Sequence, residues 1–175
     1  MNTNIWAKTI LSTYRYLQRI AGAIDKMIED RGLFSRDMSG ANFTCNNILN
    51  LSEKLIELSE RKIKLINLKI LTEQALESCG ESCASLLIAK YIDGKKNMEI
   101  IEEKGLSYRT YFRRLSDAEG RFESALAHKG FNKEKLEKYL FSEKWILEVK
   151  NRIESLRSNQ DLEVSERKLD HLAVI

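Results

Sequence analysis

The absence of proline constrains this chain more than any other feature. None of its 175 residues is a proline, and only 8 are glycines. Proline breaks a helix because it lacks an amide hydrogen and clashes with the preceding turn, and glycine weakens a helix through its backbone entropy. Because such breakers are few, and because 43% of the residues are hydrophobic and 31% charged, we expect an all-α protein built from long amphipathic helices.

Two long helices are predicted in the N-terminal half. The first, Asn4–Asp30, has apolar residues at alternating three- and four-residue steps, which is the spacing of a helix–helix seam, and Gly32 is placed to end it. The second begins near Thr44 or Asn47 and ends near Ser78, and the polar stretch between the helices has no period and is predicted as a loop. We expect an antiparallel, coiled-coil-like hairpin, although the same seams could pair between subunits.

The stretch from Ser85 to Ala127 predicts a helix-turn-helix. Asn97 is placed to cap a short helix, and Gly105 is placed to end it with a positive φ. Ser107 can then cap a longer helix that we expect to continue to Ala127. A short helix, a glycine turn and a capped second helix in this order are the layout of a helix-turn-helix.

The longer helix of this pair has two different faces. Apolar residues at steps of four, three, four and three predict its core face, and they are Tyr111, Leu115, Ala118, Phe122 and Ala125. The opposite face carries Arg109 and Arg113, and no acidic residue occurs between Ser107 and Arg114, whereas the preceding short helix is rich in glutamate. An exposed, arginine-rich first half is typical of a helix that enters the major groove of DNA.

Two groups of side chains are therefore candidate DNA contacts. An arginine can bond O6 and N7 of guanine together, and an aromatic ring can contact a thymine methyl group or a sugar. The candidates for contacts with bases are Arg109, Arg113, Phe112 and Tyr108. The candidates for contacts with phosphates, which position the protein without reading sequence, are Ser107, Arg114, Lys104, Lys95 and Lys96.

The segment YIDGKKNMEIIEEKGLSYRTYFRRL, which ends at Leu115, resembles region four of bacterial sigma factors. In that family a YxxG turn is followed by an isoleucine-rich short helix, a glycine, an apolar residue, a serine and the recognition helix. The whole chain looks like the small phage-encoded late transcription regulators of the ArpU-like group, although the resemblance covers at most the middle quarter. It implies a transcription regulator of a phage or prophage operon that reads DNA with residues 107–127. Ile101, where alanine is usual, and Tyr111, where a small β-branched residue is usual, require an adjusted helix crossing.

The C-terminal part is expected to add one further helix. Ser82 is placed to cap a helix that precedes the helix-turn-helix, and Gly130 to end the recognition helix. A last helix is predicted from Asn132 to about Arg157, followed by a polar tail. We therefore expect a helical hairpin or oligomerisation region at 1–79, the helix-turn-helix at 80–130, and the C-terminal helix and tail at 131–175.

The sequence offers little support for catalysis or for a metal or cofactor. The cysteines Cys45, Cys79 and Cys83 form no CxxC pair, and His128 and His171 are not spaced as metal ligands. Phosphate-cradling loops, nucleophile elbows and zinc-protease motifs are missing from the sequence. We therefore expect a protein that is not an enzyme. Unpaired cysteines and the lack of a signal peptide or an apolar span are typical of a cytoplasmic protein outside the membrane.

The expected partners follow from the local pattern, because the net charge of +3 is too small to indicate nucleic acid by itself. They are double-stranded DNA, RNA polymerase and further copies of the chain, with a homodimer as the first guess. Two alternatives remain open. One is a helical protein–protein adaptor, since sigma region four also contacts polymerase. The other is a small terminase-like DNA-packaging oligomer.

Overall fold

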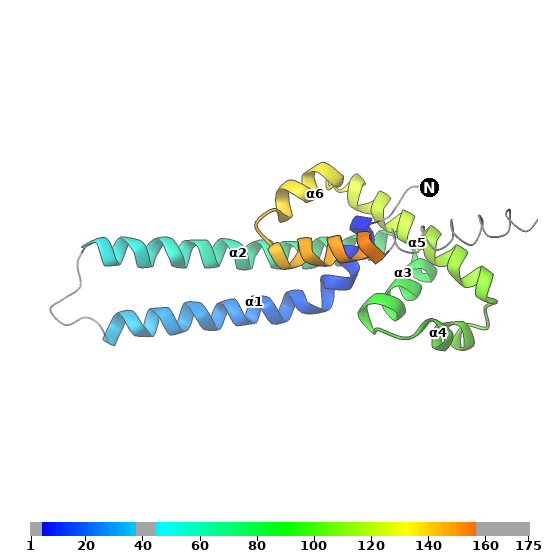
Figure 1. Cartoon of the computed structure of the whole chain (residues 1–175), viewed down its shortest axis with the longest axis horizontal. Coiled ribbons are helices and arrows are strands. Elements are labelled where there is room, and N and C mark those ends of the chain that lie inside the picture. The colour runs from blue at the N-terminus through cyan, green and yellow to red at the C-terminus, as the bar shows by residue number, and fades with distance from the viewer. Residues whose placement is uncertain (1–4, 38–44, 157–175) are drawn as a thin grey trace, which may run out of the picture. The chain divides into compact units, whose positions relative to one another are not determined.

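The computed structural model describes residues 5–37 and 45–156 (Figure 1). All regular structure within these residues is helical and no strand occurs in them, so the predicted all-α class is confirmed. Contacts divide them into two compact units, one made of 5–13 with 75–156 and the other of 14–74. None of the helices in the described ranges is both long and apolar enough to cross a membrane.

Two long helices, α1 (Ile5–Asp37) and α2 (Cys45–Ser78), form the N-terminal half. The bounds of α2 agree with the prediction. α1 is longer than predicted, because it continues through Gly32. A glycine inside a helix costs only about 1 kcal/mol relative to alanine, and no proline follows, so this glycine does not end the helix. The loop was predicted from Leu33 to Phe43, but its first five residues belong to α1. The rest of the predicted loop lies outside the described residues.

Within the 14–74 unit, α1 and α2 run antiparallel in one register. Tyr14 donates a hydrogen bond to Glu73 with an O···O distance of 2.6 Å, and Lys62 pairs with Asp25 at 2.5 Å. The separation from Tyr14 to Asp25 along α1 equals the separation from Glu73 back to Lys62 along α2. The two contacts therefore fix one antiparallel register along the hairpin. On α1 the predicted seam is buried between these contacts through Leu17 and Ile24. On α2 the prediction was wrong, because Ile48, Ile63 and Ile70 of the expected stripe are exposed and Leu65 and Leu68 are buried instead.

The other unit contains the helix-turn-helix and the helices that support it. Its helices are α3 (Glu81–Leu87), the π-helical turn η1 (Ile88–Ile92), α4 (Asn97–Glu103), α5 (Tyr108–His128), α6 (Lys133–Leu140) and a helix at 144–156. α3 packs against α5, and Figure 1 shows α4 beside them. The first turns of α1 belong to this unit as well. Trp6 is buried there, and the Nζ atom of Lys150 lies 5.2 Å from the centre of its ring.

The structure corrects two predicted helix ends in this unit. Ser82 does not cap α3, because Gly80 precedes the helix with a φ of 83° and Ser82 lies in the first turn. The predicted single helix from Asn132 to Arg157 is broken at residues 141–143. Leu140 and Ile146 are both completely buried, but an unbroken helix would turn residues six positions apart about 120° away from each other. The break allows both to reach the core.

Candidate nucleic-acid interface

The turn between α4 and α5 has the predicted construction. Gly105 has a φ of 58°, which is favourable for glycine and costly for other residues. The next amide, of Leu106, donates to the carbonyl of Ile101 at 3.0 Å and closes the end of α4. Ser107 then caps α5, since its Oγ atom accepts a hydrogen bond from the amide of Thr110 at 3.3 Å. The glycine turn and the serine cap are thus confirmed.

Asn97 does not cap α4 as predicted. Lys96 occupies the cap position, and its amide donates to the carboxylate of Glu99 at 3.0 Å. The Oδ1 atom of Asn97 instead accepts hydrogen bonds from Lys90 at 2.6 Å and from the hydroxyl of Tyr111 at 3.0 Å. Asn97 therefore ties α4 to η1 and α5. Tyr111 is completely buried, and this hydrogen bond gives its large side chain a polar partner at the helix crossing.

The candidate base-contacting residues lie on the solvent side of the first two turns of α5. Arg109 and Arg113 are exposed, and within the described residues neither side chain takes part in an ion pair or hydrogen bond. Tyr108 and Phe112 expose 64% and 36% of their surface, and their ring centres are 4.6 Å apart. The four predicted residues thus form one continuous patch of two cations and two aromatic rings.

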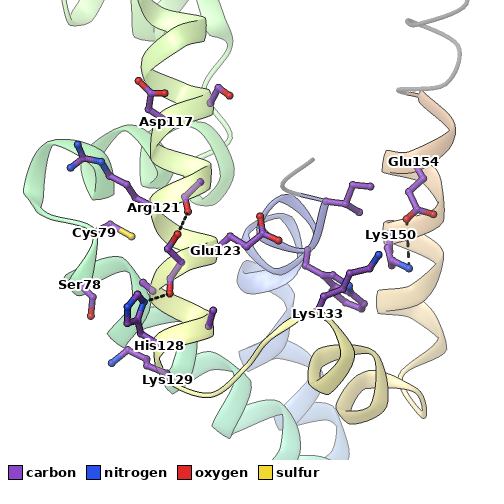
Figure 2. Close-up of a pocket in the computed structure, with 17 residues that line it drawn as sticks. Ser78, Cys79, Asp117, Arg121, Glu123, His128, Lys129, Lys133, Lys150 and Glu154 are labelled. Atoms are coloured by element: carbon purple, nitrogen blue, oxygen red, sulfur yellow. Dashed lines mark hydrogen bonds and ion pairs between the residues drawn. The ribbon is translucent and has the colours of Figure 1, made fainter. Parts of the chain in front are cut away.

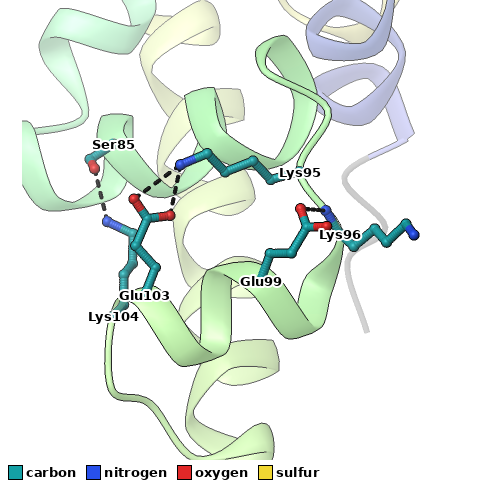
Figure 3. Close-up of polar contacts among 6 residues, drawn as sticks. All are labelled: Ser85, Lys95, Lys96, Glu99, Glu103 and Lys104. Atoms are coloured by element: carbon teal, nitrogen blue, oxygen red, sulfur yellow. Dashed lines mark hydrogen bonds and ion pairs between the residues drawn. The ribbon is translucent and has the colours of Figure 1, made fainter.

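The candidate phosphate-contacting lysines differ from one another in their surroundings (Figure 3). Lys95 reaches both carboxylate oxygens of Glu103, at 2.7 and 3.0 Å, and this hydrogen bond raises the pKa of the lysine. Lys104 donates to the hydroxyl of Ser85 at 2.9 Å. The ammonium group of Lys96 extends away from these contacts in Figure 3. Lys95 and Lys104 would therefore have to exchange an intramolecular partner for a phosphate.

A buried carboxylate that the periodicity did not reveal supports α5 from behind. Glu119 exposes only 4% of its surface, accepts a hydrogen bond from Tyr91 at 2.5 Å and lies 3.5 Å from the ammonium group of Lys8. Burial raises its pKa, against the opposing effects of Tyr91 and Lys8. The core face predicted for α5 is confirmed from Tyr111 to Phe122. These contacts hold that face against η1 and the start of α1.

A second concave region lies elsewhere in the same unit (Figure 2). It has a volume of about 1620 Å3, and its walls carry acids such as Asp117 and Glu154 together with bases such as Arg121 and Lys129. His128 is the last residue of α5 and donates from Nδ1 to the carbonyl of Ser124 at 2.7 Å. The sequence pattern gave no signal for this hollow, because its walls come from parts of the chain as far apart as Ile5 and Glu154.

The thiol in this hollow is not activated as a nucleophile. Cys79 is buried and donates from Sγ to the carbonyl of Ala75 at 3.0 Å. Burial, and to a smaller extent Cys83, raise its pKa, which favours the neutral thiol over the reactive thiolate. The mixed charge of the walls also selects no ligand of one sign. The arginine and aromatic patch on α5 is therefore the stronger candidate site.

Searches against models of protein families, against curated proteins and against solved structures found no match to the chain.

Proposed function

We propose that the chain is a sequence-specific DNA-binding transcription regulator that reads the major groove with α5. The observation that carries this proposal is the pair Arg109 and Arg113, one helical turn apart on the exposed start of a serine-capped helix and without intramolecular partners in the described residues. The major groove is about 12 Å wide and admits an α-helix. Arg109 and Arg113 are exposed at this end of the helix.

The proposed contacts follow from the chemistry of each side chain. Arg109 and Arg113 present planar forks that match guanine O6 and N7, and Tyr108 with Phe112 offers apolar edges to thymine methyl groups. Ser107 and Arg114 lie beside them and would hold phosphates. Lys96 extends from the start of α4 and would add a further phosphate contact, which lowers affinity in high salt through counterion release.

The resemblance to sigma region four extends this proposal to biology. It suggests a phage or prophage operon as the setting and RNA polymerase as a second partner. The cytoplasm is the corresponding compartment. These parts of the proposal depend on the YIDGKKNMEIIEEKGLSYRTYFRRL segment and can be tested separately from DNA binding.

A protein–protein adaptor is the second candidate function. It is favoured by the apolar share of the surface on α5, since Tyr108 exposes 64% of its area and its ring lies 4.6 Å from that of Phe112. Met98 of α4 exposes a further 57%. Exposed apolar clusters mark interaction sites for proteins. DNA would then be replaced by a partner protein that covers the aromatic rings and forms ion pairs with the arginines.

Selection from a pool of random-sequence duplexes, with the full chain at physiological salt, tests the proposal. A DNA reader enriches one sequence family and binds it well above the starting pool, as expected for specific recognition. An unchanged pool, or binding that is equal for all sequences, would contradict sequence-specific reading. Retention of RNA polymerase by the protein without any enriched DNA would favour the adaptor.

A further inference from the structure

The outward face of α2 carries a regular row of exposed aliphatic residues. Leu49, Ile56, Ile63 and Ile70 follow one another at seven-residue steps. They expose 55%, 59%, 56% and 43% of their surfaces, respectively. Single exposed apolar residues are ordinary on a protein surface, but a continuous row of this kind marks an interaction surface.

This row is separate from the seam that α2 uses inside the hairpin. A second set, which includes the completely buried Leu65 and Thr72, also repeats every seven residues. Its side of the helix carries Lys62, which pairs with Asp25 of α1. The two sets are offset by two residues, which turns them roughly 160° apart on a helix. α2 therefore has two heptad seams, and the hairpin covers one. A strict heptad repeat is the pattern of helices that supercoil around each other.

Two serines beside the row suit it to the close approach of another helix. The hydroxyl of Ser52 donates to the carbonyl of Ile48 at 2.9 Å, and that of Ser59 donates to the carbonyl of Leu55 at 2.8 Å. Both hydrogen bonds lie within α2, so a second helix can cover the serines without leaving a buried polar group unpaired. Their small side chains also leave room for larger aliphatic groups.

The charge on α2 changes sign at the middle of the row. In the half that contains Leu49 and Ile56, three acids outnumber one base, and the charged residues are Glu53, Lys54, Glu57 and Glu60. In the half that contains Ile63 and Ile70, four bases outnumber two acids, and the charged residues are Arg61, Lys62, Lys64, Lys69, Glu73 and Glu77. An antiparallel copy of α2 would place acidic half against basic half, whereas a parallel copy would place like charges together.

We propose that two copies of the chain associate through the outward faces of α2, antiparallel and related by a two-fold axis. The axis passes between Ile56 and Ile63, where the charge changes sign. A two-fold interface uses the same patch on both subunits, and the charges along α2 are complementary under that rotation. The interface goes beyond DNA recognition and does not depend on it.

Sedimentation equilibrium of the full chain without DNA tests the association. The wild-type protein should have twice the 20.3 kDa chain mass at micromolar concentration. The double variant I56E/I63E should raise the dimer dissociation constant by about two orders of magnitude or more, because it removes apolar area and buries charges. Its helical circular dichroism and melting temperature should stay near those of the wild type at monomeric concentrations, since both side chains are exposed in the single chain.

The matched control is Phe141→Glu, which changes an even more exposed apolar residue outside α2 and should leave the dimer unchanged. A wild-type monomer at high micromolar concentration would overturn the proposal. A dimer that survives I56E/I63E would overturn it as well.

The orientation of the two copies is tested by a spin label attached to the cysteine of Asn50→Cys. The variant also carries Cys45→Ser, Cys79→Ala and Cys83→Ser, so that no other thiol is labelled. In the antiparallel dimer the two labels should be roughly 30 Å apart, from a rise of 1.5 Å per residue on either side of the axis. A parallel pair would bring them within about 15 Å, close to the spacing of two packed helices. The short distance would refute the antiparallel arrangement.

Discussion

Tyr91 of η1 donates a hydrogen bond to Glu119 of α5, with 2.5 Å between the two oxygen atoms. The carboxylate is almost completely buried, and Lys8 from the start of α1 approaches its other oxygen at 3.5 Å. Three separate parts of the chain therefore meet at one ionisable group behind the candidate DNA-binding face. Because burial raises the pKa of Glu119, this contact also makes stability depend on pH.

Glu119→Gln should remove a pH-dependent loss of stability. With a folded-state pKa above the ordinary value of 4.5, the folded protein binds more protons than the unfolded one once the pH exceeds that value. The contribution of Glu119 to the unfolding free energy therefore falls as pH rises from about 4.5 through the raised pKa, and is constant above it. Between pH 4 and pH 8, the melting temperature of the variant should rise relative to that of the wild type. Glu148→Gln, at an exposed site, should show no such gain.

Two glycine substitutions should have opposite effects on stability. Gly105→Ala forces a Cβ atom into a left-handed conformation with a φ of 58° and should cost about 1–2 kcal/mol. Gly22→Ala lies within α1, has no atom within 4 Å of the added carbon, and should stabilise by about 0.5–1 kcal/mol. Urea unfolding of both variants gives the comparison. Equal effects of the two changes would contradict the turn geometry.

Tyr14→Phe should weaken the hairpin. The lost hydroxyl donates to Glu73 between α1 and α2, and removal of such a bond costs about 1 kcal/mol or somewhat more. Tyr16→Phe is the neighbouring control, because its hydroxyl only accepts a hydrogen bond from Arg15 on the exposed surface. Hydrogen exchange of the amides in 14–74 should rise in the first variant and stay constant in the second.

The proposed base contacts and phosphate contacts should respond differently to alanine substitution. Arg109→Ala or Arg113→Ala should cost about 1–3 kcal/mol at the selected DNA site and relax preference at one position. Arg114→Ala or Lys96→Ala should weaken binding to all sequences equally and reduce the salt dependence. Titrations at two salt concentrations distinguish the classes.

The controls for these alanine variants concern folding. All four variants should keep the wild-type melting temperature, since their side chains are exposed. Leu115→Asp, at a buried position, should unfold the helix-turn-helix because it buries a charge. If Arg109→Ala and Arg113→Ala leave DNA binding intact but abolish a protein contact, the adaptor reading is correct.

The ion pair between Lys95 and Glu103 should compete with DNA. Glu103→Gln removes the partner of the lysine and should raise DNA affinity a few-fold and increase the salt dependence by about one released counterion. Glu102→Gln removes the same charge from an exposed site of α4. A larger effect of Glu103→Gln than of Glu102→Gln would show that freeing the lysine matters, and equal effects would show that only net charge does.

Local sequence signals predicted the helices and the turn, but not the tertiary contacts. The period of Tyr111, Leu115 and Phe122 sets the buried face of α5, and the short-range chemistry of Gly105 and Ser107 defines the turn. Both are properties of a few neighbouring residues, which is why they could be read from the sequence.

Three features that the sequence did not reveal share one physical cause. Asn97 was predicted as a cap, but it hydrogen-bonds Lys90 and Tyr111 instead. Glu119 is not part of the predicted apolar stripe of α5, so the pattern gave no sign that it is buried. Its partners in the core are Tyr91 and Lys8, which are distant in sequence. The break at 141–143 likewise depends on where Leu140 and Ile146 find space in the core. Long-range packing decides each case, and local propensity does not report it.

The contact between Trp6 and Lys150 has a consequence for synthesis of the chain. The hairpin within 14–74 can form as soon as α2 has left the ribosome, because the contacts that fix its register, Tyr14–Glu73 and Lys62–Asp25, lie within it. Lys150 can reach the ring of Trp6 only after almost the whole chain has been made. Closing a contact over so long a loop is slow relative to local pairing. The unit that holds the candidate recognition helix is therefore the last part of the protein to mature, and a nascent chain stopped before Lys150 would lack the cation that lies beside the Trp6 ring in the finished protein.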